Sequence, residues 1–406
     1  MLTRLRDTYD EYPRQFWLVA FGVLLSSAGS SLIWPFQLIY ISKTLTLPIS
    51  AVATLVSISS ATGLAATFIV GAIADRFGRK LIMFGAMAAH GLAYILMSQA
   101  HDYIGFAIPM TIMGAAMPFY AIGSDAMMAD LIPPEKRSGA FALLRMTNNA
   151  GIAIGPAIGG LIVAKSYALA FYLAAGGMIA YSLLLLFARE TLQRQSGSSI
   201  SQRKETLGGY ERVLADGSFV GFVATVTLGM IAPLMMWTLL AVYINKYFGL
   251  PEYLYSWMPI TNALMCVFVQ YPVTMFTRRL RAKTAITLGM LVYALGVGSV
   301  AVMTSFWGFW LSMVIMSFGE LILVPTGSKY VADIAPEDLR GRYMSVYWLT
   351  WGVARSAAPM VGGYLHDAIA PQAIWWGGLA IGLTSTLGLF LLSRRRETSP
   401  EIALVD

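Results

Sequence analysis

The most informative segment of the chain reads Gly71-Ala-Ile-Ala-Asp75-Arg76-Phe-Gly78-Arg79-Lys80. Gly71 allows a neighbouring backbone to approach closely, Gly78 permits a tight turn, and Asp75 can meet a helix N-terminus or a cation. Basic residues in a short loop hold that loop on the cytoplasmic side of a membrane. The segment therefore predicts a tight cytoplasmic loop between two membrane helices.

Long segments without Asp, Glu, Lys or Arg lie on both sides of this loop. Apolar residues make up 57% of the 406 residues and charged residues 12%, whereas soluble domains average about 45–50% and about 25%. The charge-free runs are Gln15–Ser42, Thr44–Ala74, Leu81–His101, Tyr103–Ser124, Met146–Ala164, Ser166–Ala188, Gly217–Asn245, Tyr253–Thr277, Thr284–Gly319 and Ala368–Ser393. Each is long enough to cross a hydrocarbon core about 30 Å thick. This pattern excludes a soluble enzyme, a disordered chain and a disulfide scaffold.

Two features raise the number of predicted spans from ten to twelve. The run Thr284–Gly319 would form a helix about 54 Å long, so it must contain two helices with a turn near Ser305. The segment Tyr343–Leu365 would be equally apolar without Arg355. The sequence therefore predicts an all-α membrane protein with twelve transmembrane helices.

The basic residues predict which side of the membrane each helix end faces. With the N-terminus inside, 22 of the 28 Lys and Arg residues fall on the cytoplasmic side, and only Lys43, Lys165 and Lys246 fall on the other. The remaining three, at membrane depth, are Arg145, Lys329 and Arg355. This excess predicts an integral protein of the cell membrane with both termini cytoplasmic. The net charge of +7 then reflects topology, so we expect no nucleic-acid partner.

The second half of the chain repeats the first. A shift of 203 residues, half the chain length, places the predicted helices on one another without a change of register. The same shift aligns Pro133 with Pro336 and Pro156 with Pro359. We therefore expect an N-terminal six-helix half at 1–189, a polar cytoplasmic linker at 190–216, and a pseudo-symmetric C-terminal six-helix half with a short cytoplasmic tail at 217–406.

The segment 71–80 matches the signature loop of the major facilitator superfamily at each characteristic position, between the second and third predicted helices. The second-half copy, Thr277–Lys283, keeps the basic residues but has Arg278 at the position of Asp75. The chain therefore resembles a secondary transporter of this superfamily. The resemblance implies alternating access of a central site to the two sides of the membrane, with the loop motif acting in a cytoplasmic gate.

The predicted fifth helix carries glycines at helical spacing around a proline: Gly151, Gly155, Pro156, Gly159 and Gly160. Such glycines clear one helix face for close packing, and the proline removes a backbone hydrogen bond. The pattern resembles the fifth-helix motif of the twelve-helix drug:proton antiporter branch, although helix packing in any facilitator would also explain it. Two features of that branch are absent. Met110 stands in place of a fourth-helix arginine, and the first helix has no acid, its most polar mid-span residue being Gln37.

Two ionisable residues are predicted at the same depth near the membrane midplane. Glu320 lies about 21 Å into the tenth helix, and Arg355 lies about 20 Å into the eleventh from the other side. Charges at such depth are costly unless they are paired or hydrated, so each is a candidate for proton coupling. We expect a pair that breaks as Glu320 takes up a proton, or a permanent pair that holds the C-terminal half together.

A cytoplasmic gate is predicted from charges near the inner helix ends. We expect Asp125 and Arg145 to pair with each other, or with a loop network that contains Asp75, Arg76 and Asp130. Simple anchoring of the loops is the alternative. By analogy with the superfamily, the first, fourth, seventh and tenth helices should line the substrate cavity.

The candidate cavity residues, together with Asn148 of the fifth helix, are Trp34, Gln37, Met110, Met117, Phe119, Tyr120, Met235, Met236, Trp237 and Met316. Methionine and aromatic side chains adapt to varied apolar shapes, as promiscuous binding requires. Lipid contact or helix packing is the alternative for the apolar residues, and a helix–helix hydrogen bond is the alternative for Asn148.

These features predict a monomeric exporter of lipophilic or amphipathic small molecules, of the multidrug type, driven by proton antiport. Two alternatives stay open: an importer or facilitator of one polar metabolite, and a transporter-like sensor or lipid-handling protein without coupled transport. His90, His101 and His366 are scattered, so we expect no metal, cofactor or catalytic residue. No Gly-rich phosphate loop followed by Lys and Ser or Thr occurs, which argues against ATP-driven transport.

Overall fold

The computed structural model describes residues 11–192 and 210–394, except for the side chains of Ala72, Asp75 and Ser138. Within these ranges the regular secondary structure is helical. The first helices are α2 (Arg14–Leu45), α3 (Ile49–Phe77), α4 (Arg79–Ser98), α5 (Tyr103–Leu131), α6 (Pro134–Val163) and α7 (Tyr167–Leu186). The later ones are α9 (Tyr210–Ala215), α10 (Gly217–Phe248), α11 (Glu252–Tyr255), α12 (Trp257–Phe268), α13 (Gln270–Thr277), α14 (Ala282–Ser299), η1 (Val300–Val302), α15 (Phe306–Ile334), α16 (Arg340–Ala368) and α17 (Ala373–Arg394). The predicted all-α class is confirmed.

Ten of the described helices are long and apolar enough to cross a membrane. The segment α11–α12 together with α13 would make an eleventh span, bent by 57° at Val269. Helix α16 is 29 residues long, but its three arginines make it less apolar than its neighbours, and it is not among these spans. Twelve spans therefore remain a prediction.

The long charge-free run 284–319 is divided close to Ser305, as predicted. Ser305 precedes the first residue of α15, Phe306, and accepts a hydrogen bond from the backbone N–H of Gly308 at 3.4 Å. Asp102, the residue 203 positions earlier, caps α5 in the same way through Gly105. Such side-chain oxygens satisfy donors that a helix leaves unpaired at its start.

The helices that contact one another follow a repeated pattern. We call α2–α7 the N-terminal group and α9–α17 the C-terminal group. In the N-terminal group α2 packs on α6 and α7, and α4 packs on α5 and α7. In the C-terminal group α10 packs on α16 and α17, and α14 packs on α15 and α17. These pairs are counterparts under the shift of 203 residues, as the duplicated sequence leads us to expect. We propose the two six-helix halves on this basis.

A hydrogen bond of an arginine side chain also recurs under this shift. Arg137 donates to the carbonyl of Ala129 at 2.6 Å, and Arg340 donates to the carbonyl of Ala332 at 3.2 Å. In both places the guanidinium satisfies a carbonyl in the last turn of the preceding helix, where no backbone N–H is available.

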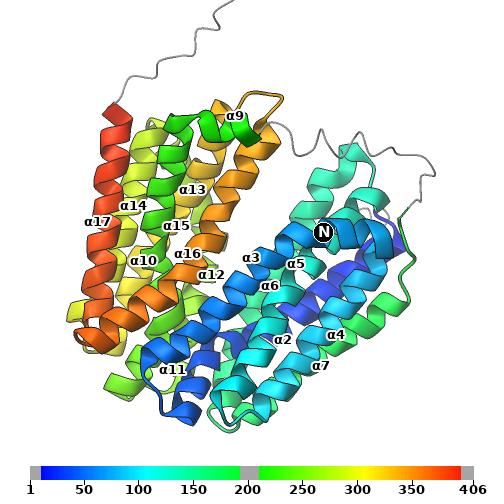
Figure 1. The fold of residues 1–406 in the computed structure, drawn as a ribbon, viewed down its shortest axis with the longest axis horizontal. Helices are drawn as coiled ribbons and strands as arrows, with labels where there is room; N and C mark the ends of the chain where they lie inside the picture. The colour runs from blue at the N-terminus through cyan, green and yellow to red at the C-terminus, as the bar shows by residue number, and fades with distance from the viewer. Residues whose placement is uncertain (1–10, 193–209, 395–406) are drawn as a thin grey trace, which may run out of the picture.

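The two groups lie side by side, meet near α11 and diverge toward the edge where α9 lies (Figure 1). The contacts between the groups are made by α3 with α16, by α2 with α10, and by α6 with α11 and α12. We call the end of the molecule where α2 begins and α17 ends the basic end, because it holds Arg14 and Arg394. The opposite end, where α2 ends and α11 begins, is the far end.

Candidate functional site

The glycine face of α6 packs directly on α2. A Cβ placed on Gly155 would overlap the hydroxyl of Ser31, and one placed on Gly159 would overlap the carbonyl of Leu32. The hydroxyl of Ser31 donates to the carbonyl of Gly151 at 3.0 Å. The predicted glycine spacing therefore lets the two backbones approach. Gly160 lies on an adjacent face, against Ser256.

Gly78 makes the turn between α3 and α4. Its φ of 95° is a conformation that glycine adopts without steric cost. At Gly71, by contrast, nothing in the described part of the chain lies within 4 Å of an added Cβ, so the expected close approach is not observed there. Arg76 is exposed and lies over the ring of Phe77, with 5.4 Å between guanidinium and centroid. The side chain of Asp75 lies outside the described atoms.

Glu190 holds the start of α4, a role that sequence reasoning missed. Its carboxylate accepts hydrogen bonds from the backbone N–H groups of Arg79 at 3.0 Å and Lys80 at 3.1 Å. The Lys80 side chain in turn donates to the carbonyl of Leu186, the last residue of α7, at 2.7 Å. An anion at a helix N-terminus and a cation at a C-terminus both complement the helix dipole. The available signal was an acid placed directly after the predicted sixth helix.

The predicted gate charges are only partly brought together. Nε of Arg79 lies 3.5 Å from Oδ2 of Asp130, and Thr191 donates to the same oxygen at 3.0 Å. Asp125 and Arg145 are both exposed, and neither forms an ion pair with another described residue. The expected Asp125–Arg145 pair is therefore not formed in this conformation.

Glu320 lies at the middle of α15 and contacts an amide instead of Arg355. Nδ2 of Asn262 on α12 donates to Oε2 of Glu320 at 2.9 Å and to Oγ of Ser317 at 2.9 Å. The expected Glu320–Arg355 pair is not formed among the described atoms. The prediction rested on equal depth along two helices, and equal depth does not fix the direction in which either side chain points. Asn262 was missed, although an amide in the middle of the charge-free run Tyr253–Thr277 was a usable signal.

A second amide holds α15 at the residue after Glu320. Pro325 has no N–H, so the carbonyl of Leu321, four residues earlier, loses its helical partner. Nε2 of Gln270 donates to this carbonyl at 3.0 Å. Gln270 is the first residue of α13, directly after the 57° bend. The bend therefore places one amide on each of its sides against consecutive residues of α15.

Arg355 is exposed and points toward the region where the two groups meet. A Cβ on Gly352, three residues earlier, would lie 3.2 Å from Leu64 of α3. A Cβ on Gly362, seven residues later, would overlap Leu239 of α10. Residues three and seven apart share one face of a helix. Arg355 therefore faces the junction of α3 and α10, and no described residue pairs with it.

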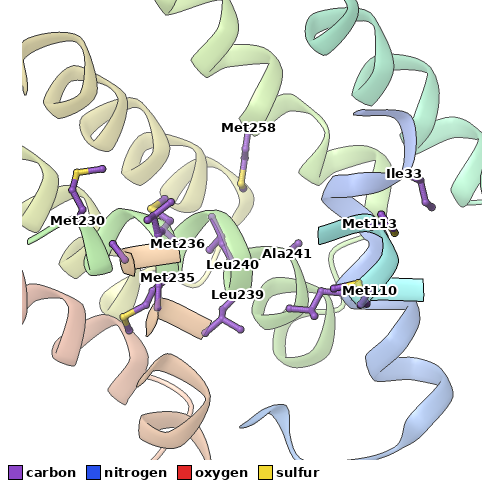
Figure 2. Packing of buried hydrophobic residues seen from close by; sticks show 14 of the residues in the cluster. Ile33, Met110, Met113, Met230, Met235, Met236, Leu239, Leu240, Ala241 and Met258 are labelled. Atoms are coloured by element: carbon purple, nitrogen blue, oxygen red, sulfur yellow. The ribbon is translucent and has the colours of Figure 1, made fainter. Parts of the chain in front are cut away.

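Most methionine candidates for the cavity are buried. Met110, Met235, Met236 and Met316 are at most 4% exposed. Figure 2 shows Met235 and Met236 on α10 packed beside Leu239 and Leu240. These four methionines therefore pack in the core in this conformation. The sequence could not predict this, because membership of a helix does not reveal which face of the helix a residue occupies.

Several other candidates also pack between helices. Gln37 is buried and donates to the sulfur of Met110 at 2.8 Å. Asn148 accepts a hydrogen bond from Ser27 of α2 at 2.6 Å, which is the helix–helix alternative weighed for it. Tyr120 packs against the ring of Tyr181 with centroids 5.7 Å apart. Phe119 packs against a small cluster made of Val70, Ala74 and Ile82.

Two of the predicted cavity residues are exposed, and a third, Trp237, packs against one of them. Trp34 is 44% exposed and Met117 is 47% exposed. Trp237 is partly exposed, and its ring centroid lies 6.2 Å from that of Trp34. The two tryptophans come from α2 and α10, so this aromatic pair lies where the two groups face each other.

Charged residues join the two groups at the far end. Nζ of Lys43, near the end of α2, lies 2.6 Å from Oε1 of Glu252 at the start of α11. Tyr167 of α7 donates to the same oxygen at 2.8 Å. The backbone N–H of Ser50 on α3 donates to Asp367 of α16 at 2.8 Å. Each of these bonds links the N-terminal group to the C-terminal group, so the far end is closed.

Side-chain hydrogen bonds described at the basic end stay within one group. Arg212 of α9 pairs with Asp338 at 3.0 Å, and Tyr343 of α16 donates to Asp216 at 2.9 Å. The bonds of Glu190 stay within the N-terminal group in the same way. Among the described bonds the two ends of the molecule therefore differ: those at the far end cross between the groups, and those at the basic end stay within one group.

Known sequences place the chain among membrane transporters. The sequence profile described as Major Facilitator Superfamily matches residues 19–279 and 218–404. The uncharacterized MFS-type transporter YhjO of Bacillus subtilis (strain 168) is 24% identical over 393 residues, which cover 96% of each chain. A Na(+), Li(+), K(+)/H(+) antiporter of Planococcus maritimus is 25% identical, with 88% of each chain covered. The multidrug resistance protein MdtH of Salmonella newport (strain SL254) is 26% identical, with 77% of each covered.

Solved structures share the same fold. The nucleoside transporter NupG superposes with a TM-score of 0.79 at 13% identity, over 95% of this chain and 100% of that one. The peptide transporter POT in complex with sulfate superposes with a TM-score of 0.76 at 16% identity, over 94% of each chain. At such low identities the likeness concerns the fold alone.

Proposed function

The chain belongs to the major facilitator superfamily and is a membrane transporter rather than an enzyme, and from that premise we propose that it exports lipophilic or amphipathic small molecules by alternating access, as a monomer driven by proton antiport. The observation that carries this proposal is the position of Glu320, a carboxylate at the middle of α15 that accepts a hydrogen bond from Asn262 of the broken span α11–α13. A carboxyl group held at membrane depth is suited to bind and release a proton.

Alternating access is supported by the different bonding at the two ends. We assign the basic end to the cytoplasm, because the excess of Lys and Arg there follows the charge rule for membrane proteins. The bonds of Lys43 and Ser50 then close the outer side. The structure would accordingly represent the state that accepts substrate from the cytoplasm, and these bonds would have to break for release outside.

Exchange of a proton for substrate would occur at Glu320. Asn262 leaves Oε1 of this carboxylate without a hydrogen-bond donor among the described residues. Arg355 lies at the same depth and is free to pair with Glu320 once the helices shift. The relatives named as a cation/H(+) antiporter and as a multidrug resistance protein are consistent with this mechanism.

The test is transport into inverted membrane vesicles. Three lipophilic dyes of different charge, ethidium, dansylamide and dansylglycine, would be followed with and without an imposed pH gradient. We expect the gradient to drive uptake of at least one dye, and we expect Glu320→Gln to abolish this uptake while the protein still binds the dye. The matched control is Glu337→Gln, an exposed acid between α15 and α16, which should transport normally. Uptake that ignores the gradient, or a fully active Glu320→Gln variant, would contradict proton antiport.

A further inference from the structure

The turn between α13 and α14 carries three exposed arginines within four consecutive residues: Arg278, Arg279 and Arg281. Helix α10 runs from the basic end to the far end, and α12 and α13 return, so this turn lies at the basic end. None of the three forms an ion pair with an acid in the described part of the chain. The backbone of four residues spans at most about 14 Å, so three like charges are concentrated at one place that favours an anion.

The turn between α3 and α4 is the counterpart of this turn under the shift of 203 residues, and it holds its basic residues next to acids. Glu190 accepts hydrogen bonds from the backbone N–H groups of Arg79 and Lys80, and Asp130 lies 3.5 Å from Arg79. Asp75 supplies a third acid in the sequence of that turn. In the N-terminal group, carboxylate oxygens therefore bind the start of the helix and the basic residues beside it.

The turn between α13 and α14 has no such acid among the described residues. The shift places Ser393, Asp333 and Arg278, in that order, at the positions of these three acids. Asp333 alone keeps a carboxylate, and it pairs with Lys329 of its own helix at 2.5 Å. The side chain of Arg281, which precedes α14, forms no capping hydrogen bond. The second turn thus keeps the positive charge and the helix start of the first, without the described carboxylates that bind them there.

An exposed aromatic surface leads along the broken span to the arginines. The side chains of Phe268, Tyr271 and Phe276 are each at least 64% exposed. Helix α13 packs on α15 and α12, and these rings point away from both. They precede the arginines in the direction of the basic end. Apolar surface is therefore followed by positive charge, in the order in which the acyl chains and the headgroup of a phospholipid follow one another.

We propose that the turn at 278–281 binds the headgroup of an anionic phospholipid, whose phosphate takes the role that the carboxylate of Glu190 has at the start of α4. Its acyl chains would lie along the exposed rings of α12 and α13. Arginine binds phosphate through paired, charge-assisted hydrogen bonds, and the start of a helix attracts the same anion. Each arginine near a bilayer surface adds about fivefold to the affinity for anionic lipid. The site is separate from Glu320 and does not depend on the direction or coupling of transport.

Native mass spectrometry of the delipidated full-length protein in detergent tests this proposal with three additives. Dioctanoylphosphatidylglycerol is an anionic lipid. Dioctanoylphosphatidylcholine has the same chains, but its choline cancels the phosphate charge, and glycerol phosphate has the anionic group without the chains. We expect the phosphatidylglycerol to bind about tenfold or more tightly than the phosphatidylcholine, and we expect no detectable glycerol phosphate at the same concentration. Equal affinities for the two lipids, or glycerol phosphate as tight as phosphatidylglycerol, would overturn the proposal.

Two variants assign the binding to the turn. A triple variant with Arg278→Gln, Arg279→Gln and Arg281→Gln should abolish the preference for phosphatidylglycerol. The same three residues replaced by lysine keep the charge, so this second variant should keep most of the preference. Loss of the preference in both would show that charge is not what binds the lipid, and an intact preference in the glutamine variant would place the lipid elsewhere.

A matched control removes the same charge from the same end of the molecule. It combines three substitutions of exposed arginines outside the turn: Arg14→Gln, Arg212→Gln and Arg394→Gln. We expect this control to keep the preference for phosphatidylglycerol. A control that loses the preference as fully as the glutamine variant would indicate general attraction to the basic end and would overturn the site. Because neither a dye nor a gradient is used, the result is separate from the transport test.

Discussion

Trp34 of α2 and Trp237 of α10 stand 203 residues apart in the sequence, at equivalent positions of its two halves, and their rings lie 6.2 Å from each other. Each ring therefore contacts its own counterpart across the junction of the two groups. Aromatic pairs of this kind contribute about 0.5–1.5 kcal/mol beyond the area they bury. This contact between the two rings would change whenever the two groups rotate against each other.

Replacing either tryptophan should weaken transport by a similar amount, because each loses the same contact. We expect Trp34→Ala and Trp237→Ala each to raise the half-saturating dye concentration about two- to tenfold. The double variant should be little worse than either single one, since the pair is already lost. Trp376→Ala on α17, whose ring is exposed outside the junction, is the control. Effects that simply multiply would show that the two rings act independently.

Asn262→Leu should move the pH profile of transport to higher pH. The substitution removes a donor to the carboxylate of Glu320, so the proton is bound more tightly and is released only in more alkaline solution. A hydrogen bond of this kind corresponds to a shift of about one pH unit. Dye uptake by inverted vesicles across a range of pH measures the shift. Ser317→Ala removes the other bond of Asn262 and the bond from Ser317 to the carbonyl of Met313, but it leaves the bond to Glu320, so its profile should match that of the wild type.

The bond between Lys43 and Glu252 should be captured by zero-length cross-linking. A carbodiimide joins an amine directly to a carboxylate, and these two groups lie 2.6 Å apart. We expect mass spectrometry of the treated protein to find a peptide that links α2 to α11. Lys43→Gln should abolish this product without changing other cross-links. A substrate or proton gradient that opens the far end should lower the yield, and a constant yield would mean that this end stays closed.

Glu190→Ala should loosen the start of α4. The carboxylate accepts from the backbone N–H groups of Arg79 and Lys80, which have no helical acceptor of their own. We therefore expect faster hydrogen–deuterium exchange at these two amides, measured by mass spectrometry. Asp338→Ala removes an exposed carboxylate from the pair with Arg212 and should leave this exchange unchanged. Unchanged exchange in Glu190→Ala would show that water replaces the cap at no cost.

Gly155→Ala should destabilise the contact between α2 and α6. The added methyl group would overlap the hydroxyl of Ser31 and the backbone of α2, so the helices must move apart. Overpacking of this kind costs about 1–3 kcal/mol. We expect a lower temperature of aggregation in detergent, followed by size-exclusion chromatography. Gly176→Ala on α7 meets open space, so it should be tolerated.

The helices could be predicted from the sequence because the absence of charge marks the membrane spans. The turn at Ser305 followed from length alone, since one run was too long for a single crossing. The ends of the helices were less well predicted: α5 extends to Leu131 and α6 begins at Pro134, so both helices include charged residues beyond the charge-free runs. A helix can continue past the hydrocarbon core, and composition does not mark where it stops.

The position of Glu320 along its helix could be predicted from the sequence, but the direction of its side chain could not. Counting along the sequence places Glu320 in the middle of its helix, and it does lie at the centre of α15, whereas its depth in a membrane stays a prediction. Its hydrogen-bond partner is Asn262 of α12 rather than Arg355, and no periodicity in the sequence predicts the bend at Val269 that separates α12 from α13. Met235 and Met236 are buried, and the sequence did not predict this for the same reason: it does not show which way a side chain points.

The break between α12 and α13 lies beside Glu320, the proton site proposed above, and would act as a joint between the two segments. On the far side of the joint α12 is held against α6, and on its near side the eight residues of α13 run toward the basic end. Asn262 and Gln270 attach these two segments to consecutive residues of α15. A change in the charge of Glu320 would therefore alter the attachment of α12 and leave that of α13 intact, so the angle between the two segments would be free to change. One proton would then act through a few hydrogen bonds on a short segment near the basic end, without the movement of a whole six-helix group.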